Sequence, residues 1–134
     1  MKSGYAHNTE IETDMKRQGS VGAMPHPAQR IALELHIRSR FFNDALFNDP
    51  CWNIVLACFA AKEAGQVFTV ADALVQARTS RETARRWLNV LRSEGWLTIE
   101  GTMRPNDVVN LTRTSRDAMM EYLDRLKSLG LERT

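Results

Sequence analysis

The segment 80–94 constrains the fold of this chain more than any other part of the sequence. Four apolar residues recur there at positions i, i+3, i+4 and i+7, which is the spacing of one helical face. They are Ala84, Trp87, Leu88 and Leu91. Thr79 and Glu82 fit a capping box, in which a hydroxyl and a carboxylate satisfy free backbone amides where a helix starts. Gly95 stands where a left-handed residue commonly ends a helix. The pattern therefore predicts a capped amphipathic helix with one face in a core.

Extended and turn-rich segments lie on both sides of this helix. Residues 96–100 and 108–111 are rich in strand-forming side chains, and the loop 101–107 between them contains Gly and Pro, which predicts a β-hairpin. Ahead of the helix, the extended residues 67–69 lead into a brief helix that Thr69 or a neighbour caps. Its apolar residues are Ala71, Leu74 and Val75. A short helix, a tight turn and a second helix form a helix-turn-helix, and a hairpin directly after it gives the order of a winged helix.

A longer helix is expected on the N-terminal side, over residues 28–47. Its apolar side chains recur at helical spacing. They are Ile31, Leu35, Phe42 and Leu46, and Phe41 and Phe47 widen the stripe. Such a stripe is either part of the core of one chain or half of a seam between two chains, and its spacing does not separate the two.

The next helix is predicted over residues 50–64. Asp49 can cap free amides and Pro50 fits the first turn of a helix without losing a hydrogen bond, so this pair is a good helix start. Gly65 is expected to end the helix. Its apolar side consists of Trp52, Val55, Leu56 and Phe59.

A final helix is predicted after the hairpin. It begins at Thr112 or Thr114 and ends near Gly130. Its apolar residues again follow helical spacing. They are Ala118, Met119, Tyr122, Leu123 and Leu126.

These elements predict one mainly α (α+β) domain, a winged helix-turn-helix with an added N-terminal helix and a C-terminal helix. A chain of 134 residues suffices for one domain with a core and is too short for two independent ones. Residues 1–24 contain few large apolar side chains and are expected to form a flexible N-terminal arm. The domain then covers residues 25–130, with the candidate dimerisation helix at 28–47, the helix-turn-helix and wing at 70–111, and the C-terminal helix at 113–129.

Basic residues are concentrated in one segment, although the net charge of the chain is only +2. Between Arg78 and Arg92 there are five arginines and one acid, Glu82, which gives this segment a charge of +4. A local basic cluster on a nearly neutral chain is typical of a binding surface for a polyanion.

The face of the 80–94 helix that points away from the core carries polar side chains. On a wheel at about 100° per residue, Glu82, Arg86 and Asn89 fall opposite the apolar face. Arg81 and Arg85 flank them. Arginine forks, amides and carboxylates match base edges in the major groove of duplex DNA. The residues near the start of such a helix usually approach the bases, which favours Arg81 as a base contact.

The candidate DNA-binding residues come from this helix, the turn before it and the hairpin loop. Arg78 and Arg92 are better placed for phosphates, which fix register without reading sequence. Arg104, at the tip of the loop, could enter a narrow minor groove. The full set is Arg78, Thr79, Ser80, Arg81, Glu82, Arg85, Arg86, Asn89, Arg92 and Arg104. The alternative is a solvated helix face and a solvated loop that carry surplus arginine.

Two stretches of the chain resemble the multiple-antibiotic-resistance regulator (MarR-like) winged-helix family, and the resemblance extends over residues 49–126. "TSRETARRWLNVLRSEGWL" at 79–97 looks like the family's recognition helix and its exit into the wing. "VVNLTRTSRDAMMEYL" at 108–123 looks like the strand that closes the wing and the start of the next helix. The resemblance implies a homodimer that binds pseudo-palindromic duplex DNA, with the terminal helices forming the dimer interface.

The sequence offers no pattern that is typical of an enzyme. It contains no nucleophile–base pair, glycine-rich phosphate loop or pair of catalytic carboxylates, so we expect no catalytic activity and no cofactor. Cys51 and Cys58 cannot form a metal site by themselves, and no histidine lies near them, so no metal is expected. Cys51 in a first helical turn is either a reactive redox sensor or, as we favour, a small buried hydrophobic residue.

The chain is therefore predicted to bind duplex DNA in a sequence-specific manner as a transcriptional regulator. The alternatives are a winged-helix protein-interaction module and an accessory subunit of a DNA-processing complex. No apolar run approaches the length of a membrane span, and two reduced thiols fit the cytoplasm, where we expect the protein to reside. The sequence indicates no particular effector.

Overall fold

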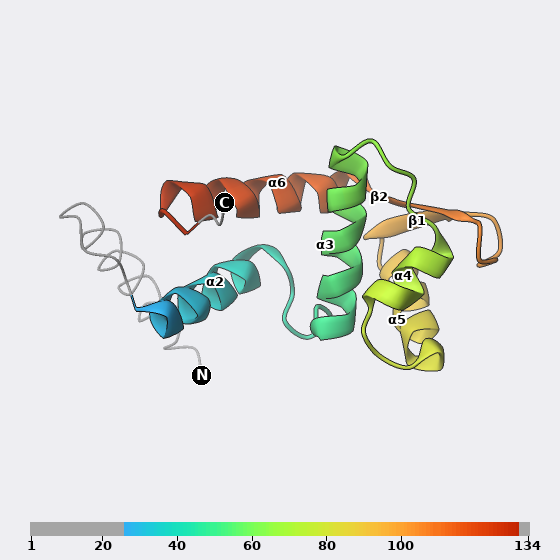
Figure 1. Cartoon of the computed structure of the whole chain (residues 1–134), viewed down its shortest axis with the longest axis horizontal. Helices are drawn as coiled ribbons and strands as arrows, with labels where there is room; N and C mark the ends of the chain where they lie inside the picture. Colours follow the sequence, from blue (N-terminus) through green and yellow to red (C-terminus); the bar gives the residue numbers. More distant parts are fainter. Residues whose placement is uncertain (1–25, 132–134) are drawn as a thin grey trace. The chain divides into compact units, whose positions relative to one another are not determined.

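The computed structural model describes residues 26–131, and the arm predicted at 1–24 lies outside them. The described chain is mainly helical with one two-stranded antiparallel sheet (Figure 1). Its elements are α2 (Pro27–Phe41), α3 (Asp49–Glu63), α4 (Val70–Gln76), α5 (Arg81–Ser93), β1 (Leu97–Glu100), β2 (Val108–Leu111) and α6 (Arg113–Ser128). The predicted fold class, a winged helix-turn-helix with helices added at both ends, is confirmed.

The chain divides into two compact units. One is Asn43–Met119, which holds the helix-turn-helix, the hairpin and the first turns of α6. The other consists of Met1–Phe42 together with Met120–Thr134, and its described part contains α2 and the rest of α6.

The core of the Asn43–Met119 unit forms where α4, α5 and β2 pack against α3 (Figure 1). Each helix contributes the small or branched side chains of one face, which are removed from water and so stabilise the unit. The buried residues include Ile54, Val55 and Cys58 of α3, Ala73 of α4, Ala84, Leu88 and Leu91 of α5, and Leu97 and Val109 of the hairpin.

The helix-turn-helix starts at Thr69, as predicted. The Thr69 hydroxyl accepts a hydrogen bond from the Asp72 amide (3.2 Å), and the Asp72 carboxylate accepts one from the Thr69 amide (3.0 Å). This reciprocal pair satisfies two of the amides that have no partner inside the helix.

The start of α5 differs from the prediction by one residue. Ser80, not Thr79, caps the helix, and its hydroxyl accepts a hydrogen bond from the Thr83 amide (3.2 Å). With the cap at Ser80, the third helical residue is Thr83, which has no carboxylate to return the bond, so the predicted capping box with Glu82 does not form.

The hairpin is held against the start of α4. The predicted hairpin is present, and its strands pair from Leu97 with Leu111 to Glu100 with Val108. The amides of Val70 and Ala71 donate to the carbonyls of Asp107 and Pro105 (both 3.0 Å), so the loop after β1 satisfies free amides of the helix start.

Two details of α3 correct the prediction. Asn48, rather than Asp49, caps the helix, and its side-chain oxygen accepts a hydrogen bond from the Cys51 amide (3.2 Å). Leu56, which was expected on the apolar side, is exposed, because the buried face runs through Cys51, Ile54 and Cys58. Gly65 follows with φ +71°, in agreement with its predicted role as the helix end.

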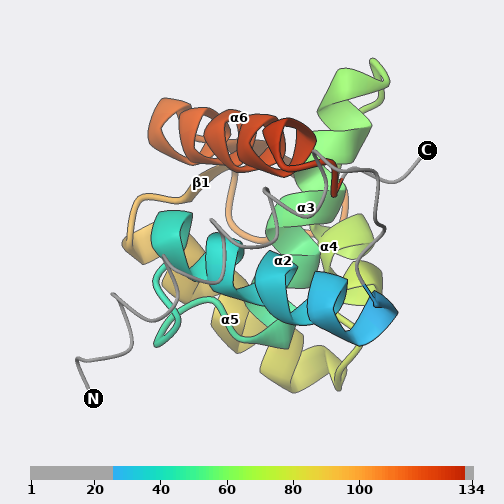
Figure 2. The same ribbon diagram turned by 90° about the vertical axis from the view of Figure 1, so that its left-hand side faces the viewer.

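α2 is shorter than the helix predicted over 28–47, since it ends at Phe41 (Figure 2). The Asn43 side chain accepts a hydrogen bond from the Ala45 amide (2.9 Å), a local turn that competes with helix continuation. Leu33 and Ile37 are the buried residues of α2. Of the predicted stripe, Phe42 and Phe47 are buried, whereas Ile31 is 53% exposed and Leu35 is 51% exposed.

Of the two predicted starts of α6, Thr112 and Thr114, the structure has Thr112. The Thr112 hydroxyl accepts a hydrogen bond from the Ser115 amide (3.2 Å) and itself donates to the Gly95 carbonyl (2.8 Å). One side chain thus caps α6 and fixes it to the end of α5. Gly130, with φ +70°, follows the helix as expected.

Candidate nucleic-acid interface

The outward face of α5 is laid out as the helical wheel predicts. Ala84, Leu88 and Leu91 are fully buried, which fixes the rotation of the helix about its axis. Arg81, Glu82 and Arg86 are exposed on the other side. Trp87, predicted in the apolar set, is only half-buried.

Arg85 is half-buried and is bound to the hairpin loop. Its guanidinium Nη1 donates a hydrogen bond to the Met103 carbonyl (3.4 Å). Met103 is itself buried and has a φ of +71°, so the loop backbone turns sharply at the residue that Arg85 holds. Arg85 therefore connects α5 to the wing, a contact that the sequence did not reveal.

Asn89 and Arg92 form a pair on the last turns of α5. Arg92 Nη2 donates to Asn89 Oδ1 (2.8 Å), and Asn89 is half-buried while Arg92 is exposed. The amide oxygen of Asn89 is therefore engaged, and its amino group remains as a donor.

The turn before α5 places three predicted residues at the surface. Arg78 is exposed and has a φ of +56°, an unusual conformation for a residue other than glycine. Thr79 and Ser80 are also exposed. The Ser80 hydroxyl already accepts the capping bond from α5, so its main role here is structural.

Arg104 lies exposed in a compact wing loop. Its backbone amide donates to Asp107 Oδ2 (2.8 Å), which folds the loop back on itself. The Asp107 carboxylate lies directly over Gly101, where any side chain would collide with it. Met103 and Asp107 shape the loop and were missed from the sequence, although a glycine and an aspartate that bracket a loop are a recognisable turn signal.

The positive charges of the candidate DNA-binding arginines are not neutralised by neighbouring carboxylates of the described residues. Within residues 26–131, none of Arg78, Arg81, Arg85, Arg86, Arg92 and Arg104 forms an ion pair with a carboxylate. The structure thus brings together the α5 residues, the turn and the wing in one unit, with Arg85 as the link between them.

Both cysteines are buried and free, which agrees with the favoured interpretation of Cys51 as a small hydrophobic residue. Burial raises the pKa of the Cys51 thiol to about 12. Burial likewise raises the pKa of Cys58 to about 11, an effect that nearby Lys62 partly offsets. A protonated, buried thiol is a poor nucleophile, which argues against a peroxide sensor at Cys51.

Two kinds of site are absent from the described chain. Residues 26–131 contain no group of three or more His, Cys, Asp or Glu side chains that could hold a metal ion. None of the helices in this range combines the length and apolar character that crossing a bilayer requires.

Comparison with known proteins supports the fold. No family model matches the chain, and no curated protein matches it. A solved structure that is similar to it is the heme sensor protein PefR in complex with heme and carbon monoxide. The two share 16% sequence identity over 79% of this chain and 80% of that chain, with a TM-score of 0.51. At this identity the similarity concerns the fold, and it agrees with the winged-helix architecture.

Proposed function

We propose that this protein is a MarR-like transcriptional regulator that binds duplex DNA with α5 in the major groove and the wing beside it. The observation that carries the proposal is the array of guanidinium groups on the helix-turn-helix and wing, most of them exposed and none in an ion pair with a carboxylate among residues 26–131. Such an array on a near-neutral chain is suited to phosphates, whose neutralisation dominates DNA affinity.

Residues of the array are assigned different contacts. Arg81, Glu82 and Arg86 are free to meet base edges, because α5 buries its opposite face. Arg78 and Arg92 are assigned to phosphates, and Arg104 to the minor groove beside the wing. Arg85 is assigned to positioning the wing, because one nitrogen of its guanidinium donates to the Met103 carbonyl.

The protein is proposed to act as a homodimer in the cytoplasm. The exposed apolar residues Ile31 and Leu35 of α2 supply a face for a second copy. Two copies would present two α5 helices to half-sites about one helical turn of DNA apart.

The test is selection of bound sites from a random duplex pool, followed by titration of the selected site at several salt concentrations. We expect the affinity of the wild type to fall steeply with salt. Arg86→Gln should weaken binding about tenfold or more and relax the preference at one base position. Arg92→Gln should weaken all sequences alike and lower the salt slope by about one.

Lys127→Gln is the matched control, because Lys127 is exposed in the last turn of α6 and its loss also removes one positive charge. It should leave DNA affinity unchanged. If the wild type selects no site and binds no mixed DNA at low salt, the arginine surface is better explained as a docking site for an acidic protein partner.

A further inference from the structure

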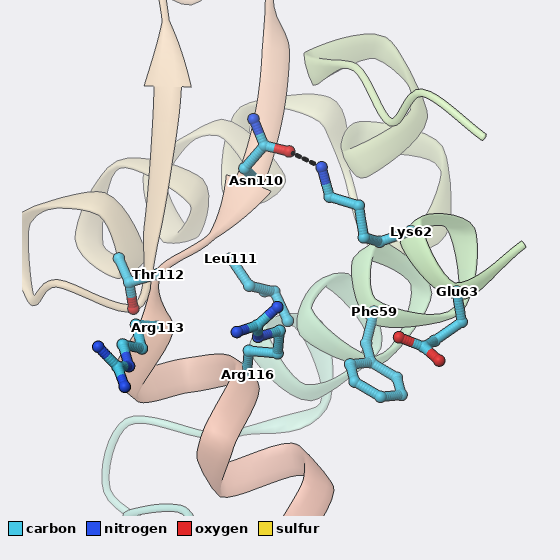
Figure 3. A pocket seen from close by; sticks show the side chains of 8 residues that line it. All are labelled: Phe59, Lys62, Glu63, Asn110, Leu111, Thr112, Arg113 and Arg116. Carbon is cyan, nitrogen blue, oxygen red and sulfur yellow. Dashed lines mark hydrogen bonds between the residues drawn. The ribbon is translucent and has the colours of Figure 1, made fainter. Parts of the chain in front are cut away.

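A pocket of about 550 Å³ lies in the Asn43–Met119 unit, between the end of α3, the end of β2 and the first turns of α6 (Figure 3). We refer to it as the α3–α6 pocket. Phe59 and Leu111 form its apolar wall, and Lys62 and Arg116 also line it. None of the residues predicted to bind DNA lines it.

The lining of this pocket is positively charged. Lys62, Arg113 and Arg116 contribute three cations, and Glu63 contributes one carboxylate. Arg113 is 89% exposed and pairs with Asp117 (3.9 Å), so it is the cation least available to a ligand. The Arg116 side chain, by contrast, forms no hydrogen bond or ion pair with any residue in the range 26–131.

This combination of groups selects a class of ligand. An arginine fork and a lysine ammonium together suit a phosphate group, because the fork donates two parallel hydrogen bonds and the ammonium adds a point charge. The apolar wall of Phe59 and Leu111 suits a hydrophobic body, and pockets for small ligands typically combine such a wall with a few convergent polar groups. We propose that the α3–α6 pocket binds a small organic phosphate monoester, with its phosphate at Lys62 and Arg116 and its apolar body on Phe59.

The proposed site is connected to the wing by hydrogen bonds. Lys62 Nζ donates to Asn110 Oδ1 (2.5 Å), and Asn110 Nδ2 donates to Glu100 Oε2 (3.3 Å). Asn110 belongs to β2 and Glu100 to β1. A phosphate that draws Lys62 away competes with the Asn110 amide, so ligand binding changes the contacts of both wing strands. This coupling exists whether or not the protein binds DNA.

Isothermal titration of the full chain with phenyl phosphate tests the proposal, with inorganic phosphate and benzamide as the comparison compounds. We expect saturable binding of one phenyl phosphate per chain, tighter than the binding of either comparison compound. Lys62→Gln and Arg116→Gln should each weaken it by about fivefold or more, as expected for the loss of one charge-assisted contact. Lys127→Gln removes the same charge far along α6 in sequence and should change the affinity by less than about twofold.

A second readout follows the hydrogen-bond chain to the wing. In ¹H–¹⁵N spectra, phenyl phosphate should shift the side-chain amide signals of Asn110 and the backbone signal of Glu100 in the wild type, and shift them much less in Arg116→Gln. These spectra also report whether each variant is folded. Failure of the folded wild type to bind phenyl phosphate at millimolar concentration, equal affinity for benzamide, or unchanged affinity in both folded pocket variants would each overturn the proposal.

Discussion

At Arg78 the backbone adopts a φ of +56°, which an L-residue with a side chain reaches only at a cost in free energy. The residue lies in the turn between α4 and α5, where glycine would be the cheaper choice. An exposed arginine at such a position lowers the stability of the fold, but it places a guanidinium at the edge of the proposed DNA surface. Replacement of this residue by glycine should therefore raise stability and weaken DNA binding.

Arg78→Gly and Arg78→Ala separate the two effects. Both remove the guanidinium and should weaken DNA binding about equally. Only glycine relieves the left-handed backbone, so Arg78→Gly should be more stable than Arg78→Ala by about 1 kcal/mol. Urea denaturation measures the difference, and equal stability of the two variants would show that the turn adopts another conformation.

The buried thiols predict how stability depends on pH. Their ordinary pKa is 9.0, and burial raises it to about 12 for Cys51 and about 11 for Cys58. As the pH rises above 9, the unfolded chain loses these protons first, which favours unfolding. The contribution of each thiol to stability is therefore complete below pH 9 and is lost as the pH rises toward the folded value.

Urea denaturation at pH 7.5, 9 and 10 tests this prediction. The free energy of unfolding should fall over the upper part of this range, with a limiting slope of about 1.4 kcal/mol per pH unit for each thiol. Other groups titrate in the same range, so the comparison is with Cys51→Ala, which should show a shallower slope. An identical slope in the two proteins would contradict the assignment of Cys51.

At the scale of elements, hydrogen bonds from two helices hold the loop of the wing. The start of α4 donates to the carbonyls of Pro105 and Asp107, and α5 reaches the same loop through Arg85. The loop is thus held by both helices of the helix-turn-helix. These contacts contribute to holding the loop that carries Arg104 next to α5.

Arg85→Met and Arg86→Met form a matched pair for this arrangement. Arg85→Met removes a half-buried hydrogen bond and should destabilise the fold by about 0.5–1.5 kcal/mol. Arg86 is exposed, and Arg86→Met should change stability by less than about 0.5 kcal/mol. Chemical denaturation measures both, and amide hydrogen exchange of the loop should accelerate only in Arg85→Met. Equal effects of the two substitutions on stability and on loop exchange would contradict the positioning role of Arg85.

Elements whose signals are local could be predicted from the sequence. The face of α5, the strands of the hairpin and the Thr69 cap follow from spacing and capping chemistry within a few residues. The end of α2 was missed because the Asn43 turn outweighs an apolar stripe that continues beyond it. The cap of α5 was displaced by one residue because Thr79 and Ser80 are chemically equivalent candidates.

Most residues of the candidate site could be identified from the sequence, but their tertiary contacts could not. Arg81, Glu82 and Arg86 were placed outward by the helical wheel alone. The partner of Arg85 is the backbone carbonyl of Met103, eighteen residues away, and no local sequence pattern predicts a contact across that separation. The α3–α6 pocket is likewise assembled from two segments that are distant in sequence, 59–63 and 110–116, which only tertiary structure brings together.

At the scale of the whole molecule, the distribution of exposed apolar side chains bears on assembly. Ile31 and Leu35 lie one helical turn apart on α2, and each exposes about half of its side chain. Leu33 and Ile37 bury the other face of the same helix. A helix that buries one apolar face and exposes another is suited to pairing with a second chain, as proposed above.

The dimer predicts that Leu35→Glu separates the protein into monomers without unfolding it, because Leu35 is already half exposed and a charge there meets water in the monomer. Val75→Glu is the matched control: Val75 is 74% exposed on α4, in the other unit, so the same change should leave the assembly intact. Sedimentation at micromolar concentration should give a dimer for the wild type and the control, and a monomer for Leu35→Glu.

The monomer should also bind a two-half-site DNA more weakly, because only one α5 then reaches the duplex. A wild type that sediments as a monomer would remove the dimer from the proposed function while leaving the arginine surface of α5 to be tested on its own.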